Sequence, residues 1–186
     1  MGMADRAPTP DEIAVMQAGV REALAAGAWG MSTGLSYAPG QWASRDEVVA
    51  AARPLAERPV PALYASHIRN ESDELIAAVS EALSIGAELG VPVEVSHLKA
   101  AGVRNFGKTR DALGLIAEAR AAGRRAGADM YPYEAGSTYL SQLFPPWVFD
   151  GGIETMLQRL RSTDVRRRIR HDIETGLPAW GNLLRA

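Results

Sequence analysis

The chain alternates short apolar runs with segments in which apolar residues recur at helical spacing, and this alternation constrains its fold more than any other feature. The apolar runs occupy residues 28–33, 62–66, 91–96 and 126–131, and the helical segments between them occupy about residues 44–57, 73–89 and 109–122. Strands that alternate with helices pair in parallel through right-handed crossovers. The sequence therefore predicts an α/β fold with about four consecutive strand–helix units.

Capping residues indicate where several of the helices begin and end. The stretch Thr9-Pro10-Asp11-Glu12 combines a capping threonine, a proline in the first turn and a glutamate three residues after the cap. A helix is therefore expected at about 10–26. Ser44 and Glu47 form a second pair of this kind, and Pro54 is expected to kink or end the helix that follows.

The alternation stops after residue 133, where a loop rich in Gly, Pro and aromatic residues begins. Helical spacing returns near residues 152–161 and 164–174. We therefore expect residues 1–133 to form the strand–helix units and residues 134–186 to form a helical insertion or lid.

Composition narrows the classes of function. The chain has 186 residues, with 20 Lys and Arg against 22 Asp and Glu, so its net charge of -2 gives no overall attraction to nucleic acid or to an anionic membrane. It contains no Cys, which rules out disulfides and thiolate metal ligands. No apolar run approaches the length of a membrane helix, and no signal-peptide pattern is present, so a cytoplasmic location is expected.

Two of the three histidines lie in equivalent frames. Ser66-His67-Ile68-Arg69 closes the second apolar run and Ser96-His97-Leu98-Lys99 closes the third, 30 positions later. Functional residues gather at the carboxyl ends of parallel strands, and imidazole is a common metal ligand. We therefore expect His67 and His97 to bind a metal ion.

The basic residue of each frame lies two positions after the histidine. If the extended conformation continues, Arg69 and Lys99 point to the same side as His67 and His97, where they could bind a substrate carboxylate. The alternative for either cation is a salt bridge to a loop acid such as Glu71 or Asp73.

Two further motifs have competing interpretations. Residues 102–109 match the phosphate-binding P-loop pattern, but the first glycine comes late after its strand and no strand ending in Asp supplies a magnesium partner, so a lid is favoured over a nucleotide site. Tyr131 and Tyr133 could be core aromatics or could present hydroxyl groups to a ligand.

Five segments together resemble one known family. They are residues 30–40 (GMSTGLSYAPG), the two Ser-His frames, residues 102–108 and residues 129–138 (DMYPYEAGST). They closely resemble motifs of the N-acyl-D-amino-acid deacylases, or D-aminoacylases, a branch of the amidohydrolase superfamily. The resemblance implies part of a (β/α)8 TIM barrel, and it implies a hydrolase that uses Zn2+ to cleave the non-peptide amide bond of N-acyl-D-amino acids.

The resemblance also implies roles for individual residues. His67 and His97 match the zinc ligands at the ends of the fifth and sixth barrel strands. Five residues match positions around the substrate, namely Arg69, Lys99, Tyr37, Tyr131 and Ser137. Residues 1–133 match the central portion of the barrel, and residues 134–186 match a helical insertion that covers the site.

Parts of the family pattern are missing from this sequence. It contains no His-x-His pair and no Cys, and no residue matches the catalytic Asp of the last strand, so the catalytic residue is unknown. A closed barrel needs eight strand–helix units and about 250 residues. We therefore expect an internal fragment of a longer deacylase. It would be inactive alone, and it would need the rest of the barrel or self-association to cover its open strand edges.

Three alternatives remain at this stage. The barrel could act on a cyclic amide, as hydantoinases and dihydropyrimidinases do. The chain could instead be a P-loop nucleotide-binding module, or a non-catalytic remnant that folds only with a partner. In the leading interpretation the partner is a small-molecule substrate, an N-acyl-D-amino acid, and neither nucleic acid nor membrane is involved.

Overall fold

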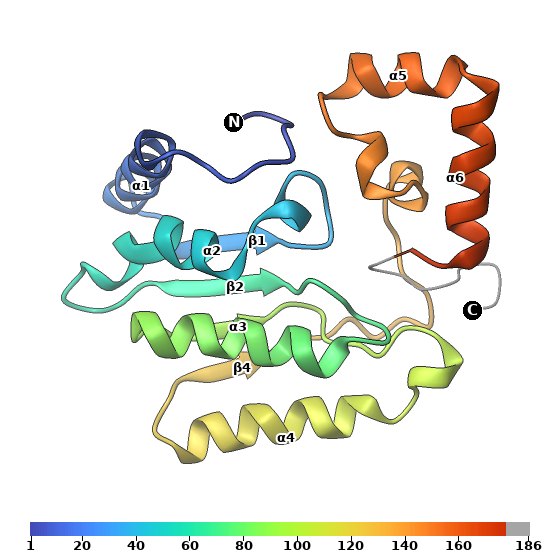
Figure 1. Ribbon diagram of the computed structural model, residues 1–186. Coiled ribbons are helices and arrows are strands. Elements are labelled where there is room, and N and C mark those ends of the chain that lie inside the picture. Colours follow the sequence, from blue (N-terminus) through green and yellow to red (C-terminus); the bar gives the residue numbers. More distant parts are fainter. Residues whose placement is uncertain (178–186) are drawn as a thin grey trace.

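The fold is built on a parallel sheet of four strands whose spatial order is their order in the sequence (Figure 1). A computed structural model describes residues 1–177. The strands are β1 (Gly30–Gly34), β2 (Leu63–His67), β3 (Val93–Val95) and β4 (Ala126–Ala128), and each pairs in parallel with the next. Sequential parallel strands joined by helices are the arrangement of consecutive units of a (β/α)8 barrel. The expected α/β class and partial barrel are confirmed.

Helices connect the strands and cover one face of the sheet (Figure 1). α1 (Pro10–Ala25) precedes β1, and the connecting helices are α2 (Arg45–Ala52), α3 (Leu75–Leu89) and α4 (Lys108–Ala121). The remaining helices are α5 (Ile153–Arg161), α6 (Thr163–Thr175) and the short 3-10 helices η1 (Gly40–Trp42), η2 (Arg53–Ala56), η3 (Val103–Asn105), η4 (Leu140–Leu143) and η5 (Pro146–Val148). Within residues 1–177, no helix has both the length and the apolar character needed to cross a membrane.

The capping residues act as the sequence predicts. The Thr9 side chain accepts a hydrogen bond from the backbone N–H of Glu12, and the Glu12 carboxylate accepts one from the backbone N–H of Thr9. α2 ends at Ala52, and the chain tightens into η2, which contains Pro54. α3 ends on Gly90, whose φ of 67° lies in the left-handed region that glycine adopts without strain.

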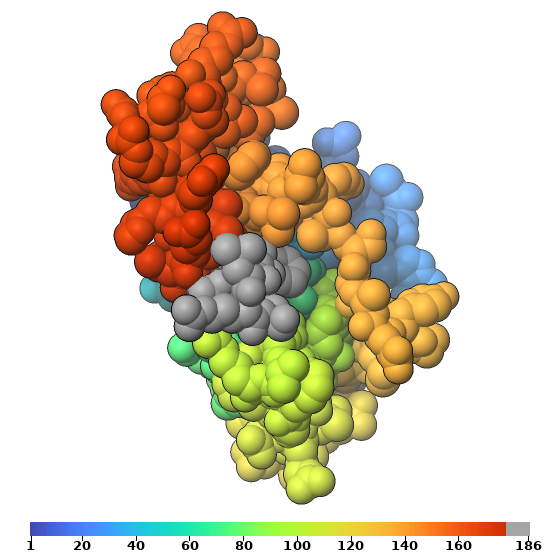
Figure 2. Space-filling view, turned by 90° about the vertical axis from the view of Figure 1, so that its right-hand side faces the viewer, coloured from blue at the N-terminus to red at the C-terminus, as the bar shows by residue number. Residues whose placement is uncertain are grey.

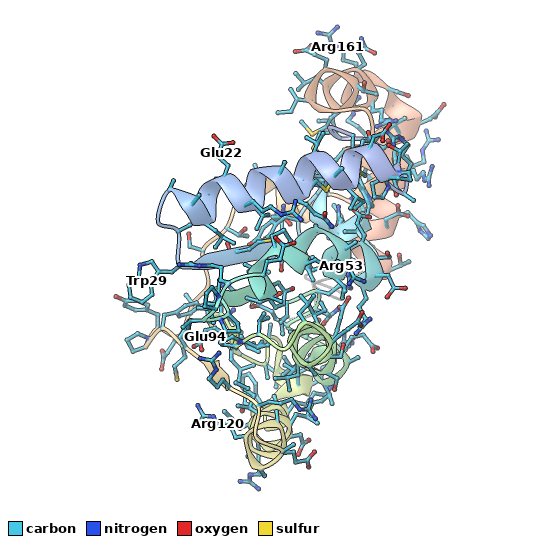
Figure 3. All side chains as sticks on the ribbon, turned by 90° about the vertical axis from the view of Figure 1, so that its left-hand side faces the viewer. Glu22, Trp29, Arg53, Glu94, Arg120 and Arg161 are labelled. Atoms are coloured by element: carbon cyan, nitrogen blue, oxygen red, sulfur yellow. The ribbon has the colours of Figure 1, made fainter. Side chains whose placement is uncertain are left out.

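The hydrophobic core lies between the sheet and the helices α2, α3 and α4. Residues that are almost wholly buried there include Leu55, Tyr64, Ile68, Leu75, Val79, Ile85 and Val95. Within residues 1–177, no helix covers the opposite face of the sheet, and Glu94 projects from it (Figures 1 and 3). Figure 3 shows Trp29 and Glu94 on this side, with Arg53 of the helical layer on the other. The sheet therefore has one packed face and one open face.

The segment after β4 forms a separate helical unit at the carboxyl ends of the strands (Figures 1 and 2). The Trp147 indole N–H donates to the Asp172 carboxylate at 2.8 Å, and the guanidinium of Arg168 lies 4.0 Å from the centre of the Trp147 ring. The helices of this segment, η4, η5, α5 and α6, end at Thr175, and residues 178–186 lie outside the described residues.

Gly86 allows α3 to lie close against β3. A Cβ at this position would lie 1.9 Å from the Cγ2 of Val93 and 3.1 Å from the carbonyl oxygen of Val91. The Val93 side chain of β3 and the Val91 carbonyl just before β3 would have to move to make room for it. The absence of a side chain at Gly86 therefore sets how closely this helix approaches the sheet.

We predict that Gly86→Ala lowers the free energy of unfolding by about 1–3 kcal/mol, because the added methyl group overpacks the interface between α3 and β3. Gly114→Ala in α4 is the matched control, since a Cβ there would meet nothing within 4 Å. The control is expected to raise stability by about 0.5–1 kcal/mol through helix propensity. Urea unfolding measures both, and equal effects of the two substitutions would contradict the packing argument.

Candidate metal centre

The register of β2 and β3 brings two histidines together. His67 is the last residue of β2, and His97 follows β3 by two positions, after Ser66 has paired with Val95. Their ring centroids are 4.6 Å apart with the planes near perpendicular. The Nδ1 of His67 lies 2.9 Å from the Nε2 of His97. Two imidazole nitrogens therefore face one another at the carboxyl edge of the sheet, as the paired frames predicted.

An unusual backbone conformation directs the His97 ring. His97 has a φ of 41°, in the left-handed region that a residue other than glycine seldom adopts. The Asp129 carboxylate accepts a hydrogen bond from the His97 backbone N–H at 2.6 Å, and the Asp129 carbonyl accepts one from the Leu98 N–H at 2.8 Å. β4 therefore ends at Ala128, earlier than the expected residue 131, because Asp129 leaves the strand pattern to hold this turn.

The second nitrogen of each imidazole has a hydrogen-bond partner. The Nε2 of His67 lies 2.6 Å from the Ser36 hydroxyl oxygen, and the Nδ1 of His97 lies 2.9 Å from the Glu71 Oε1. Ser36 and Glu71 are 4% and 5% exposed, so both partners are fixed within the protein. The two nitrogens that face one another are therefore the ring atoms that could act as metal ligands.

The donor set suits a transition metal such as zinc. His67 and His97 supply the two facing nitrogens, and the Glu71 carboxylate, which lies within 4.8 Å of ligand atoms of both, contacts the outer nitrogen of His97. Burial lowers the pKa of His67 to about 4, with smaller contributions of the same sign from His97 and Lys99 and an opposing one from Glu71. A neutral imidazole is the form that binds a metal ion, so His67 is ready to do so at neutral pH.

Lys99 lies beside His97, although the extended conformation on which that expectation rested ends at Val95. Its ammonium group is 2.5 Å from the Glu71 Oε1, 3.0 Å from the His97 Nδ1 and 5.2 Å from the centre of the Tyr131 ring. The salt bridge to Glu71 that was considered as an alternative is therefore present. This salt bridge uses one of the three N–H donors of the Lys99 ammonium.

Arg69 has a partner that the sequence did not indicate. Its guanidinium donates to both carboxylate oxygens of Glu81 on α3, with the Nη2–Oε1 distance at 2.8 Å, and to the carbonyls of Gln41 and Ala43 at 3.0 and 2.9 Å. The sequence suggested a substrate carboxylate, or Glu71 or Asp73, as the partner. In the structure Arg69 instead fastens the loop after β1 to α3.

The remaining predicted site residues lie around the histidine pair. The Tyr37 ring is 4.7 Å from the His67 ring, and the Tyr131 ring is 6.3 Å from the His97 ring. Ser137 is exposed. The hydroxyl oxygens of its neighbour Thr138 and of Tyr37 are 3.4 Å apart. The segment that contains Ser137 therefore passes next to Tyr37.

The glycine-rich loop before α4 makes contacts that leave its lysine engaged. The Lys108 ammonium donates to the Asp73 carbonyl at 2.9 Å, and Arg104 binds the Asp73 carboxylate at 2.5 Å. η3 also separates β3 from α4, so the loop does not run directly from a strand into a helix. These contacts do not favour the P-loop alternative.

Three residues of the site were not predicted as such from the sequence. Ser36 and Asp129 lay within the family-like motifs, and Glu71 was considered only as a salt-bridge partner of a cation. The available signal was the position of Glu71 in the sequence, four residues after His67, which closes the strand. It was weak, because a glutamate near a strand end is common on protein surfaces.

Comparisons with known proteins give one consistent result. No protein-family model matches the chain. The D-aminoacylase of Alcaligenes xylosoxydans xylosoxydans is 45% identical over 137 residues, which are 74% of this chain and 28% of that protein. The chain thus spans a little over a quarter of the length of the curated relatives it matches.

Solved structures agree with the sequence match. The N-acyl-D-glutamate deacylase of Bordetella bronchiseptica, solved with zinc and a phosphonate inhibitor that mimics the tetrahedral intermediate, is 44% identical. It superposes with a TM-score of 0.68 over 72% of this chain and 28% of that one. A D-aminoacylase structure described as defining a novel subset of amidohydrolases is 43% identical, with a TM-score of 0.69 over 73% of this chain and 28% of that one.

Because burial lowers the pKa of His67, we predict that acid destabilises the metal-free protein through this residue. Between about pH 6.5, the usual histidine pKa, and about pH 4, its pKa in the folded protein, the unfolded chain binds a proton that the folded chain does not. Stability must therefore fall as the pH is lowered through this range. Chemical unfolding in the presence of a chelator measures the slope, and His67→Gln should make it shallower. An unchanged slope in His67→Gln would contradict the assignment.

Proposed function

We propose that this chain, which belongs to the N-acyl-D-amino-acid deacylase family of the amidohydrolase superfamily, supplies two zinc ligands and part of the substrate pocket for the hydrolysis of N-acyl-D-amino acids. The products would be a D-amino acid and a carboxylate. One observation carries the proposal. The Nδ1 of His67 and the Nε2 of His97 face one another at 2.9 Å on adjacent parallel strands, in a chain that is 45% identical to a D-aminoacylase.

The chain's own residues would prepare the ligand nitrogens. Ser36 and Glu71 hold the outer nitrogens, so the rings cannot turn away, and burial keeps His67 neutral. Zinc bound by such imidazoles lowers the pKa of a bound water and polarises the amide carbonyl. A carboxylate would carry the proton to the leaving amine. We assign this role to no residue of this chain.

We place the substrate carboxylate at Lys99 rather than at Arg69. The Lys99 ammonium lies beside His97 and over the Tyr131 ring, and only one side of it is occupied by Glu71. The Arg69 guanidinium is already paired with Glu81 and two carbonyls, so its effect on substrate would act through the loop that it fastens. If the substrate carboxylate is anchored at a fixed distance from the metal, only one enantiomer of the substrate would present its acyl group to the metal.

Tyr37, Tyr131 and Ser137 complete the proposed pocket. The Tyr37 ring lies next to His67 and the Tyr131 ring lies near His97, and the segment around Ser137 approaches the Tyr37 hydroxyl. In this proposal residues 1–133 form the barrel portion, and residues 134–186 are the helical insertion that covers the site. Completion of the barrel by further strands, or by self-association, would cover the open edges of the sheet at β1 and β4. A cytoplasmic location belongs to the same proposal.

Zinc binding should depend on two histidines and not on the third. We predict that His67→Asn and His97→Asn each weaken zinc binding at least tenfold, because each substitution removes one of the facing nitrogens. His171→Asn is the control, since His171 lies exposed on α6. Competition with a chromogenic zinc chelator measures the three affinities, and a loss of affinity in the control alone would refute the assigned site.

Activity is best tested in a chimaera, because the chain alone lacks the family's His-x-His pair and Cys. We predict that a D-aminoacylase whose matching segment is replaced by this chain's hydrolyses an N-acetyl-D-amino acid and not its L-enantiomer. His97→Asn in the chimaera should abolish the reaction. A folded chimaera that cleaves only a cyclic amide such as a hydantoin would favour the alternative substrate class, and robust acetate release by the chain alone would refute the expectation that it is inactive.

A further inference from the structure

The Glu71 carboxylate lies within hydrogen-bond distance of both His97 and Lys99. It is 5% exposed, and its Oε1 atom is 2.9 Å from the Nδ1 of His97 and 2.5 Å from the ammonium of Lys99. Its carbonyl oxygen also accepts a hydrogen bond from the Ala101 N–H at 2.7 Å. Both its backbone and its side chain are therefore held against the loop that follows β3.

The His97 ring has two possible neutral forms, and its neighbours favour different ones. A neutral imidazole carries its proton on Nδ1 or on Nε2. With the proton on Nδ1, His97 donates to Glu71, and the lone pair of Nε2 faces His67. With the proton on Nε2, the Nδ1 lone pair could accept from Lys99, which lies 3.0 Å away. Only the first form leaves Nε2 able to bind a metal ion.

We propose that Glu71 is a positioning residue that selects the Nδ1-protonated form of His97 against the competing Lys99 ammonium. A carboxylate is a hydrogen-bond acceptor only, so it is satisfied when His97 and Lys99 both donate to it. The inference rests on the proposed metal site, since its consequence is to keep the Nε2 lone pair of His97 free for zinc. Carboxylates that orient metal-binding histidines in this way raise metal affinity.

The partner of His67 differs in kind. The Ser36 hydroxyl, 2.6 Å from the Nε2 of His67, can donate or accept, so it holds the ring without choosing where the proton lies. In the metal-free protein the contact between the two rings needs one hydrogen. Once Glu71 has fixed the proton of His97 on Nδ1, that hydrogen must come from the Nδ1 of His67. Glu71 therefore determines the proton arrangement of the pair in the metal-free protein. When a metal ion binds, the His67 proton would move to Nε2, where the Ser36 hydroxyl can accept it, and the Nδ1 of His67 would be free as a ligand.

The direct test is the tautomer of His97 in the metal-free chain, read from proton–nitrogen correlation spectra of histidine-labelled protein at neutral pH. Wild type is expected to show the proton on Nδ1. Glu71→Gln should shift the population toward Nε2, and adding Lys99→Met to Glu71→Gln should reverse part of that shift by removing the competing donor. Glu81→Gln is the matched control, because Glu81 is also largely buried and paired with a cation, Arg69. It should leave His97 unchanged.

A second measurement follows cobalt(II) binding by its absorption spectrum. Glu71→Gln should weaken binding about 10–100-fold, and Glu81→Gln should not. If wild type binds no cobalt, the proposed metal site fails while the tautomer measurement still decides the role of Glu71. Wild-type His97 with its proton on Nε2 would overturn the inference without any variant. So would a Glu71→Gln protein that folds, as judged by its amide spectrum, and keeps the wild-type tautomer.

Discussion

The parallel pairing of β2 with β3 is the interaction on which the site depends. It sets Ser66 against Val95, and the backbone N–H of Ser96 then donates to the Ser66 carbonyl at 3.0 Å just beyond the strand. This register brings together two histidines that are 30 residues apart in the sequence. A slip by one residue would turn the side chains of one strand to the other face of the sheet.

The electrostatics of the site follow from burial. Removing His67 from water lowers its pKa, so the ring stays neutral where a surface histidine would be partly protonated. The charges of Glu71 and Lys99 oppose one another beside His97, which avoids leaving one buried charge without a partner. We propose that the same ammonium group also binds the substrate carboxylate. The neutral His67 ring and the Lys99 ammonium thus both lie beside His97.

The sequence predicted most of the fold because its signals were local. The capping box at Thr9 and Glu12, the proline that ends α2 and the glycine after α3 each act within a few residues, and each is confirmed. The two histidines were predicted because a repeated frame at strand ends implies proximity. Where the sequence fell short, the cause was contact between distant residues. β4 ends early because Asp129 holds His97, and Arg69 pairs with Glu81 because of the face that α3 presents.

The roles of Glu71 and Ser36 could not be predicted for the same reason. Each contacts a histidine only after the strands have paired, and neither residue type implies such a contact by itself. The central claim, that His67 and His97 bind zinc through their facing nitrogens, is tested most directly by zinc-edge X-ray absorption of the zinc-loaded chain. The account predicts nitrogen ligands at about 2.0–2.1 Å with the scattering pattern of two imidazoles, lost when both histidines are replaced. Zinc coordinated by oxygen alone, or an imidazole signal that persists in the double variant, would contradict it.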